Sequence, residues 1–208
     1  HDIVNHCVND ILVQGARPLF FLDYIASSKL DPAMVAAVVS GAAAACQAAG
    51  CALLGGETAE MPGVYAAGEF GLVGTIVGVV DRMGIIDGST IRPGDAVIGL
   101  ASSGLHTNGF SLARRVFEGW DLRAELPELG RPLGDALLAP HRCYLAEIQH
   151  LRRAGVAVKG LAHITGGGFY ENIPRSIPDG LCAEIDRSAI RILPIFQLIA
   201  QTGSIPQR

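Results

Sequence analysis

The stretch from Pro32 to Gly56 contains no charged residue, and it limits the possible folds of this chain more than any other feature. Its length alone would suit a membrane-spanning helix. Alanine dominates it, however, and Asp31, Pro32 and Gly50 are typical of an N-cap, a first helical residue and a helix stop. We therefore predict a buried helix over residues 32–49 followed by a strand, and no membrane as a partner.

Helical and strand patterns alternate along the rest of the chain. Residues 2–14 have helical period, with one apolar face formed by Val4, Cys7, Val8, Ile11 and Leu12. Further helices are expected at 109–118, at 140–153 and after Pro194, and strands at 18–25, 51–54, 72–80, 96–101, 156–164 and 181–185. Residues 81–95 lose the period and are rich in turn residues, which predicts two domains, 1–82 and 83–208. The predicted fold class is α/β or α+β.

The composition excludes one class of partner and indicates a compartment. Half of the 208 residues are apolar and 17% are charged, as in globular chains. The net charge is −4 and the basic residues are scattered, so we expect no nucleic acid as a partner. The five cysteines lie mostly within apolar runs and lack C-x-x-C or Cys/His ligand spacing, which indicates buried thiols in a reducing cytoplasm.

An Asn-Asp pair interrupts the first apolar helical pattern. Asn9 and Asp10 project from the last turns of this helix, just before a Gly-Ala-Arg-Pro corner. An unpaired buried carboxylate would be costly, so Asp10 needs compensation. One interpretation is a surface Asp or a pair with Arg17. The other is a Mg²⁺ ligand or a holder of a ligand hydroxyl, since hard cations prefer carboxylate oxygens.

A second acidic stretch follows two glycines. An apolar strand is expected to end at Gly55 and Gly56, and Glu57, Thr58 and Glu60 follow. Carboxylates at the end of a strand are where α/β folds place ligands, and glycines allow the backbone to approach a bulky anion. Carboxylates alone would repel a phosphate, so this stretch predicts a divalent cation; an acidic surface loop is the alternative.

Two glycine-rich turns follow apolar segments in the second half of the chain. They are "SSGLHTNGFS" (residues 102–111) and "HITGGGFYENIP" (residues 163–174). Each offers several backbone N–H groups before a helical segment, an arrangement that can hold phosphate, although each could also be an ordinary tight turn. His106 could act as a general acid or base, bind phosphate or lie on the surface, and His163 is equally ambiguous.

These stretches together resemble one enzyme family. "NDILVQGARPLFFLDY", "GGETAEMPGVY", "IIDGS", "SSGLHTNGFSL", "LLAPHRCY" and "AHITGGGFYENIPR" occur in the order and spacing found in phosphoribosylformylglycinamidine cyclo-ligases, also called aminoimidazole ribonucleotide synthetases. The resemblance implies a two-domain fold whose N-terminal sheet forms a barrel across a homodimer. It also implies a purine-biosynthesis ligase that uses ATP and Mg²⁺. In this reaction ATP phosphorylates the formyl amide oxygen of formylglycinamidine ribonucleotide, and a substrate nitrogen then closes the imidazole ring.

The resemblance also assigns roles to residues. Asp10, Gly15, Ala16 and Pro18 match the D-x4-G-A-x-P corner at the nucleotide site of the superfamily, beside Asn9. Asp10 and Glu57 are the implied metal ligands, and His106 and Asn108 the implied catalytic residues. The remaining implied ATP and ligand-binding residues are Gly55, Gly56, Thr58, Gly104, Gly109, Thr165, Gly166, Gly167 and Gly168. The sequence leaves open which turn holds the substrate phosphate and which holds ATP.

Two family motifs have no counterpart in these 208 residues. The family has a D-G-V-G-T-K motif upstream of the position of His1 and an N-x-G-x-G-M motif downstream of Arg208, so we expect this chain to be a fragment. A noncatalytic, dimerising nucleotide-binding module is a second hypothesis. Another enzyme of the superfamily, such as a small-molecule kinase or selenophosphate synthetase, is a third.

Overall fold

The computed structural model describes residues 1–206, which divide into two compact units. The first contains His1–Ile91 and Cys143–His163, and the second contains Arg92–Arg142 and the chain from Ile164 onward. The segment 143–163 therefore belongs with the N-terminal unit, whereas the predicted division assigned it to the C-terminal domain. The boundary at residues 82 and 83 stays a prediction.

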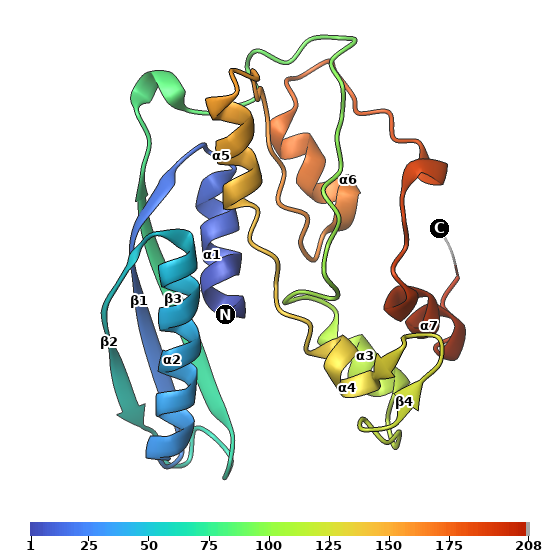
Figure 1. Cartoon of the computed structure of the whole chain (residues 1–208). Coiled ribbons are helices and arrows are strands. Elements are labelled where there is room, and N and C mark those ends of the chain that lie inside the picture. Colours follow the sequence, from blue (N-terminus) through green and yellow to red (C-terminus); the bar gives the residue numbers. More distant parts are fainter. Residues whose placement is uncertain (207–208) are drawn as a thin grey trace. The chain divides into compact units, whose positions relative to one another are not determined.

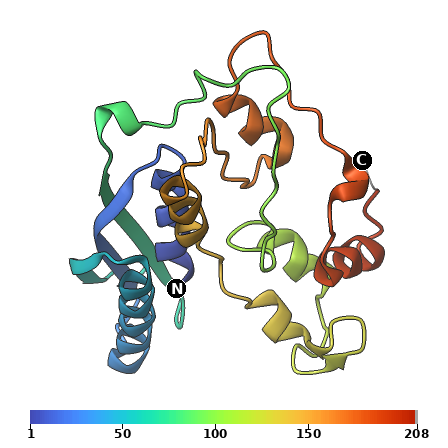
Figure 2. The ribbon, with the colours of Figure 1, turned by 45° about the horizontal axis from the view of Figure 1, so that its top comes forward.

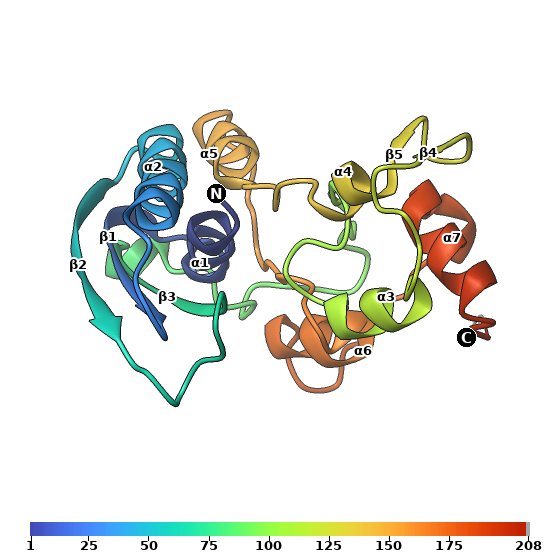
Figure 3. The same ribbon diagram turned by 90° about the horizontal axis from the view of Figure 1, so that it is seen from below.

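The first unit is a three-stranded sheet covered on one face by helices (Figures 1 and 3). The strand order is β2 (Ala52–Glu60), β1 (Arg17–Ser27), β3 (Phe70–Val79), with β1 parallel to β2 and antiparallel to β3. The helices are α1 (Asp2–Leu12), α2 (Pro32–Ala49) and α5 (Leu145–Arg153), and a single 3₁₀ turn, η1, spans Arg82–Gly84. Val4, Val8 and Phe21 are fully buried between α1 and the sheet, which confirms the predicted apolar face of the first helix.

Helix α2 begins and ends where the sequence predicts. The Asp31 side chain accepts a hydrogen bond from the backbone N–H of Ala33, Pro32 is the first helical residue, and Gly50 ends the helix at φ 68°. The prediction that α2 is buried is wrong, because only Ala42, Ala45 and Cys46 are buried. One face lies against the sheet, and the small side chains of the other face remain exposed. Among the described residues α2 is the one helix that is long and apolar enough to span a membrane.

Strand β2 continues through the two glycines, so the predicted loop at Gly55 is wrong. Gly56 pairs with Asp23 on β1, and a Cβ atom on Gly56 would collide with the Asp23 side chain and backbone. Glycine is therefore required here for the close approach of two strands. Gly55, in contrast, has open space where a Cβ atom would stand.

The second unit consists mainly of short helices joined by long connections (Figure 2). Its elements are α3 (Phe110–Val116), β4 (Glu125–Leu126), β5 (Arg131–Pro132), α4 (Leu133–Leu137), α6 (Gly168–Asn172), η2 (Ile173–Ser176), η3 (Arg187–Ala189) and α7 (Pro194–Thr202). Leu105, Phe117, Leu133 and Ile195 contribute to its core. The predicted helices at 109–118 and after Pro194 are confirmed as α3 and α7.

The predicted strands at 96–101, 156–164 and 181–185 are not strands in the described part of the chain. A strand is defined by its ladder, and none of these segments has a ladder partner among residues 1–206. Val97 and Ile98 are exposed for the same reason. The predicted helix at 140–153 begins later, at Leu145, because residues 140–144 have no helical hydrogen-bonding pattern.

Candidate functional site

The neighbouring polar residues of helix α1, Asn9 and Asp10, differ in their exposure to solvent. Asn9 is only 2% exposed, and its Oδ1 accepts a hydrogen bond of 3.0 Å from the backbone N–H of Tyr144. This bond joins α1 to the segment that leads into α5. Asp10, the next residue, has a side chain that is 52% exposed. Asn9 therefore links α1 to the segment before α5, and the nucleotide contact that the resemblance implies for it stays a prediction.

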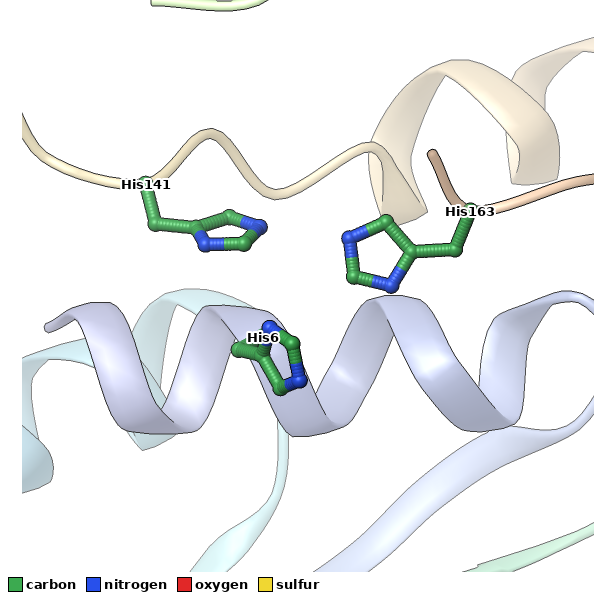
Figure 4. A group of neighbouring side chains, drawn as sticks. All are labelled: His6, His141 and His163. Atoms are coloured by element: carbon green, nitrogen blue, oxygen red, sulfur yellow. The ribbon is translucent and has the colours of Figure 1, made fainter. Parts of the chain in front are cut away.

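Two histidines flank the Asp10 carboxylate. His163 Nδ1 lies 2.8 Å from Asp10 Oδ1, and His6 Nε2 lies 3.3 Å from Asp10 Oδ2. His6 and Asp10 are four residues apart on α1, so they share a helix face, and the His163 ring lies over the same helix (Figure 4). The centroids of the two rings are 5.1 Å apart. The sequence interpretation that paired Asp10 with Arg17 is wrong, since the partners of the carboxylate are imidazoles.

Gly15 forms the corner that connects α1 to β1. It has φ 79°, and its N–H donates to the Leu12 carbonyl at 2.7 Å. Arg152 of α5 fixes the same corner by donating from Nη1 to the Gly15 carbonyl at 2.8 Å and from Nη2 to the Gly84 carbonyl at 3.3 Å. Ala16 and Pro18 are buried just beyond the corner. The D-x4-G-A-x-P motif is thus a rigid turn that positions the end of α1.

Glu57 does not lie near Asp10 within the first unit. Asp23 and Gly56 face the helices, whereas Glu57 pairs with Tyr24 and lies on the opposite face of the sheet. The side chain of Ile11, the residue after Asp10 on α1, lies against Gly78 of β3. Gly78 pairs with Pro18 of β1, and Pro18 is six residues before Tyr24 on that strand. That separation is about 20 Å along the strand. The structure therefore does not bring Asp10 and Glu57 together within one chain, and their role as Mg²⁺ ligands stays a prediction.

Within β2, Glu57 has a local partner. Its Oε1 accepts a hydrogen bond of 2.9 Å from the backbone N–H of Thr58. Both residues are exposed, and both belong to the strand rather than to a loop after it. Their implied contacts with ATP stay predictions.

In the second unit, His106 organises the first glycine-rich turn. Its backbone has φ 57°, which is uncommon for a residue other than glycine. The Nε2 atom accepts backbone N–H groups from Ser103 at 3.1 Å and Arg142 at 3.4 Å. Nε2 must therefore carry a lone pair, and the neutral ring has its proton on Nδ1. The ring also stacks on His141, with centroids 4.1 Å apart and an interplanar angle of 21°.

The stacked rings of His106 and His141 hold the first glycine-rich turn in place. His141, which is also labelled in Figure 4, belongs to the second unit and is 1% exposed. Its Nδ1 lies 3.4 Å from Thr107 Oγ1. Gly109, at φ 88°, ends the turn and precedes α3, while Gly104 lies close to Ala139. The catalytic role implied for His106 stays a prediction, and the geometry gives the ring a positioning role as well.

The structure brings the two glycine-rich turns of the second unit together. A Cβ atom on Gly166 would lie 3.2 Å from Asn108 Oδ1, so the second turn lies directly against Asn108. Asn172 holds the second turn, because its Nδ2 donates to the Gly168 carbonyl at 2.8 Å and its Oδ1 accepts from Thr165 Oγ1 at 3.2 Å. Adjacent turns rich in backbone N–H groups can hold an anionic group.

Most cysteines are poorly suited to nucleophilic chemistry. Burial raises the pKa of the Cys7 thiol to about 11, with a smaller contribution from the nearby Asp10 carboxylate. Burial raises the pKa of the Cys46 thiol to about 12, with a smaller contribution from Cys51. Burial also raises the pKa of Cys143. Cys182 is exposed, so the prediction of buried thiols holds for only part of the set.

Sequence reasoning missed His6, His141 and Arg152. His6 could have been found, because its position four residues before Asp10 on a helix places both side chains on one face. The signal for Arg152 and His141 is absent from the local sequence, since their partners are distant along the chain.

Two family models and several curated proteins match this chain. Residues 1–80 match the model described as AIR synthase related protein, N-terminal domain, and residues 92–203 match the corresponding C-terminal domain model. A Bifidobacterium longum (strain DJO10A) protein named phosphoribosylformylglycinamidine cyclo-ligase is 56% identical over 211 residues, covering 100% of this chain and 61% of that protein. A Burkholderia mallei (strain SAVP1) protein of the same name is 56% identical over 206 residues, covering 98% and 58%, respectively.

The chain therefore spans about three fifths of the length of these relatives. Among solved structures, thiamine monophosphate kinase from Aquifex aeolicus has a TM-score of 0.49 at 21% identity, over 72% of this chain and 47% of that chain.

Proposed function

Because the chain belongs to the AIR synthase related family, we propose that it is part of a phosphoribosylformylglycinamidine cyclo-ligase of de novo purine biosynthesis. The observation that carries this proposal is the 56% identity over the whole chain to proteins of that name. The proposed substrates are ATP and formylglycinamidine ribonucleotide. The proposed products are ADP, phosphate and aminoimidazole ribonucleotide.

The proposed chemistry has two steps. The formyl amide oxygen attacks the γ-phosphorus of ATP, a new P–O bond forms, and ADP leaves. A substrate nitrogen then attacks the activated carbon, the C–O bond breaks, and phosphate departs with the former amide oxygen. An amide oxygen leaves only after such activation, so the protein mainly has to position two anionic ligands.

Two regions of the chain support this positioning role. The corner at Gly15, braced by Arg152, fixes the end of α1 and with it the Asp10 carboxylate. In the second unit, Asn108 lies against the turn at Gly166, where main-chain N–H groups could contact an anionic group. We propose that both regions contact the ligands, and we leave open which turn holds which phosphate.

The carboxylate of Asp10 suits the Mg²⁺ ion that accompanies ATP, because Mg²⁺ is often bound by one or two carboxylates together with substrate phosphates. Bound Mg²⁺ would neutralise charge on the phosphates. The role proposed for Asp10 is to orient this complex. Within one chain Glu57 lies on the sheet face opposite to the helices, so Asp10 carries this part of the proposal.

A homodimer is proposed from the uncovered face of the sheet in the first unit. Leu54 and Val73 are 65% and 55% exposed, and Phe20, Leu22, Tyr24 and Val77 lie on the same face. Contiguous apolar surface on a sheet is expected to be covered by a partner. We propose that the same face of a second copy covers it, as in the barrel that the family resemblance implies. Glu57 would then lie at the interface.

We also propose a cytoplasmic location, with no nucleic acid or membrane partner. The net charge of −4 supports the absence of nucleic acid. The buried thiol of Cys46 and the partly buried thiol of Cys7 support a reducing compartment.

The proposal is tested by measuring ADP release from ATP by the complete protein, with and without formylglycinamidine ribonucleotide. Substrate-dependent ADP release is expected. Absent release, or release at the same rate without the ribonucleotide, would overturn the proposal and favour a nucleotide-binding module. Asp10→Asn should weaken Mg·ATP binding in calorimetry, whereas the control Asp135→Asn, at an exposed position in α4, should not.

A further inference from the structure

We propose that His6, Asp10 and His163 form a binding site for a divalent transition-metal cation of the Zn²⁺ or Co²⁺ type. All three residues belong to the first unit. His6 and Asp10 come from α1, and His163 comes from a segment 153 residues further along the chain. This convergence of two imidazoles on one carboxylate is independent of the glycine-rich turns of the second unit.

The types of ligand atom suit such a cation. Imidazole nitrogen binds Zn²⁺, Ni²⁺, Cu²⁺ and Fe²⁺, and two histidines with one carboxylate form a recurrent three-ligand set that leaves further positions open. Mg²⁺ instead demands oxygen ligands in a near-octahedral arrangement. The two nitrogens beside Asp10 therefore favour transition cations over Mg²⁺.

The distances are also close to those of a metal site. With metal–ligand bonds of about 2.0–2.1 Å, neighbouring ligand atoms in a tetrahedral site lie about 3.3 Å apart. The observed distances are 3.3 Å from His6 Nε2 to Asp10 Oδ2 and 2.8 Å from His163 Nδ1 to Asp10 Oδ1, so each histidine approaches its own oxygen of the carboxylate. A ring nitrogen of His6 and one of His163 lie within 4.8 Å of each other.

The surroundings hold the site in shape and leave it accessible. The hydrogen bond from Tyr144 to Asn9 fixes the α1 turn that carries Asp10. The His163 side chain is 9% exposed, so its neighbours restrict its ring. Asp10 itself is half exposed, which leaves room for water or another ligand in the remaining coordination positions.

A cation in this site would use the same carboxylate that the proposed function assigns to Mg·ATP. Occupation by the transition cation should therefore compete with Mg·ATP binding. The cation site itself needs no nucleotide, so its existence does not depend on the proposed function.

The test is a titration of the untagged chain with Co²⁺ alone, followed by visible absorption and calorimetry. The chain should carry Cys182→Ser, since this exposed thiol could bind the cation elsewhere. We expect one bound Co²⁺ per chain. His6→Gln and His163→Gln should each weaken the affinity at least tenfold, while the control His150→Gln, at an exposed position of α5, should leave it unchanged.

A second measurement separates lost ligands from lost folding. Without metal, the variants should unfold at the same temperature as the parent, and Zn²⁺ should raise the unfolding temperature of the parent and of His150→Gln only. No Co²⁺ binding, or equal binding by His6→Gln and His150→Gln, would overturn the proposal. Failure to bind Co²⁺ together with normal Mg·ATP binding would overturn this inference alone.

Discussion

Asn9 and Asp10 illustrate how far single residues can be interpreted from sequence. The pattern marked both as unusual in an apolar helix, and the half-exposed Asp10 carboxylate does have two imidazole partners. The sequence did not reveal that Asn9 faces inward and caps a distant N–H group, or that the Asp10 partners are histidines. Helical spacing shows which residues are neighbours on the same helix. It does not show which distant segment of the chain packs against that helix in the folded protein.

Replacing Asn9 should destabilise the first unit. Asn9→Ala removes the side-chain acceptor of the hydrogen bond from the partly buried Tyr144 N–H, which is expected to cost about 1–3 kcal/mol in the free energy of unfolding. Urea denaturation measures this value. Gln47→Ala, at an exposed position of α2, is the control and should change the value by less than about 0.5 kcal/mol. Equal effects of the two substitutions would show that the Asn9 hydrogen bond contributes nothing.

The cysteines should differ in reactivity, since only the thiolate attacks an alkylating reagent. At pH 8 iodoacetamide should modify Cys182 rapidly and Cys7 and Cys46 slowly, because burial raises the pKa values of the latter two. A raised pKa in the folded state also means that stability falls as the pH rises from about 9 towards 11, where the unfolded thiols ionise first. Peptide mass spectrometry after a timed reaction checks the order. Equal rates at the three positions would contradict it.

At the scale of elements, the sequence predicted helices better than strands. Asp31, Pro32 and Gly50 gave the bounds of α2 because capping is a local interaction. Gly55 and Gly56 suggested a loop, yet β2 continues to Glu60, since its ladder with β1 depends on a distant partner. The same reason explains the missing strands at 96–101 and 181–185, where the described residues supply no neighbouring strand. Local sequence encodes a cap directly, whereas strand pairing depends on the tertiary fold.

The two glycines of β2 provide a matched pair of substitutions. Gly56→Ala places a methyl group against Asp23 and should destabilise the protein by about 1–3 kcal/mol. Gly55→Ala points into open space and should change the free energy of unfolding by less than about 0.5 kcal/mol. Denaturant titration of both variants checks this difference. A smaller loss for Gly56→Ala than for Gly55→Ala would contradict the observed register of β1 and β2.

At the scale of the whole molecule, the family resemblance predicted more than the residue patterns did. The order of motifs identified the family that the two domain models then matched. Within one chain Glu57 lies on the sheet face opposite to the helices, away from Asp10, so a Mg²⁺ site that they share stays a prediction. The uncovered apolar sheet face was not visible in the sequence as such, since β3 lies beside β1 only after folding.

The proposed dimer can be broken on that sheet face. Val73→Lys places a charge on the uncovered face and should shift the protein from dimer to monomer at micromolar concentration without unfolding it, because Val73 is already half exposed. Sedimentation velocity measures the shift, with Val156→Lys, an exposed position outside the sheet, as the control. A Val73→Lys protein that sediments as the same dimer would contradict this interface.

The most direct test of the central claim follows one oxygen atom. Formylglycinamidine ribonucleotide labelled with ¹⁸O in its formyl group is converted by the complete protein with unlabelled ATP, and the released phosphate is analysed by mass spectrometry. Phosphorylation of the amide oxygen predicts one ¹⁸O atom in each phosphate formed. Unlabelled phosphate released alongside ADP would show that ATP is hydrolysed by water, and it would contradict the proposed cyclo-ligase.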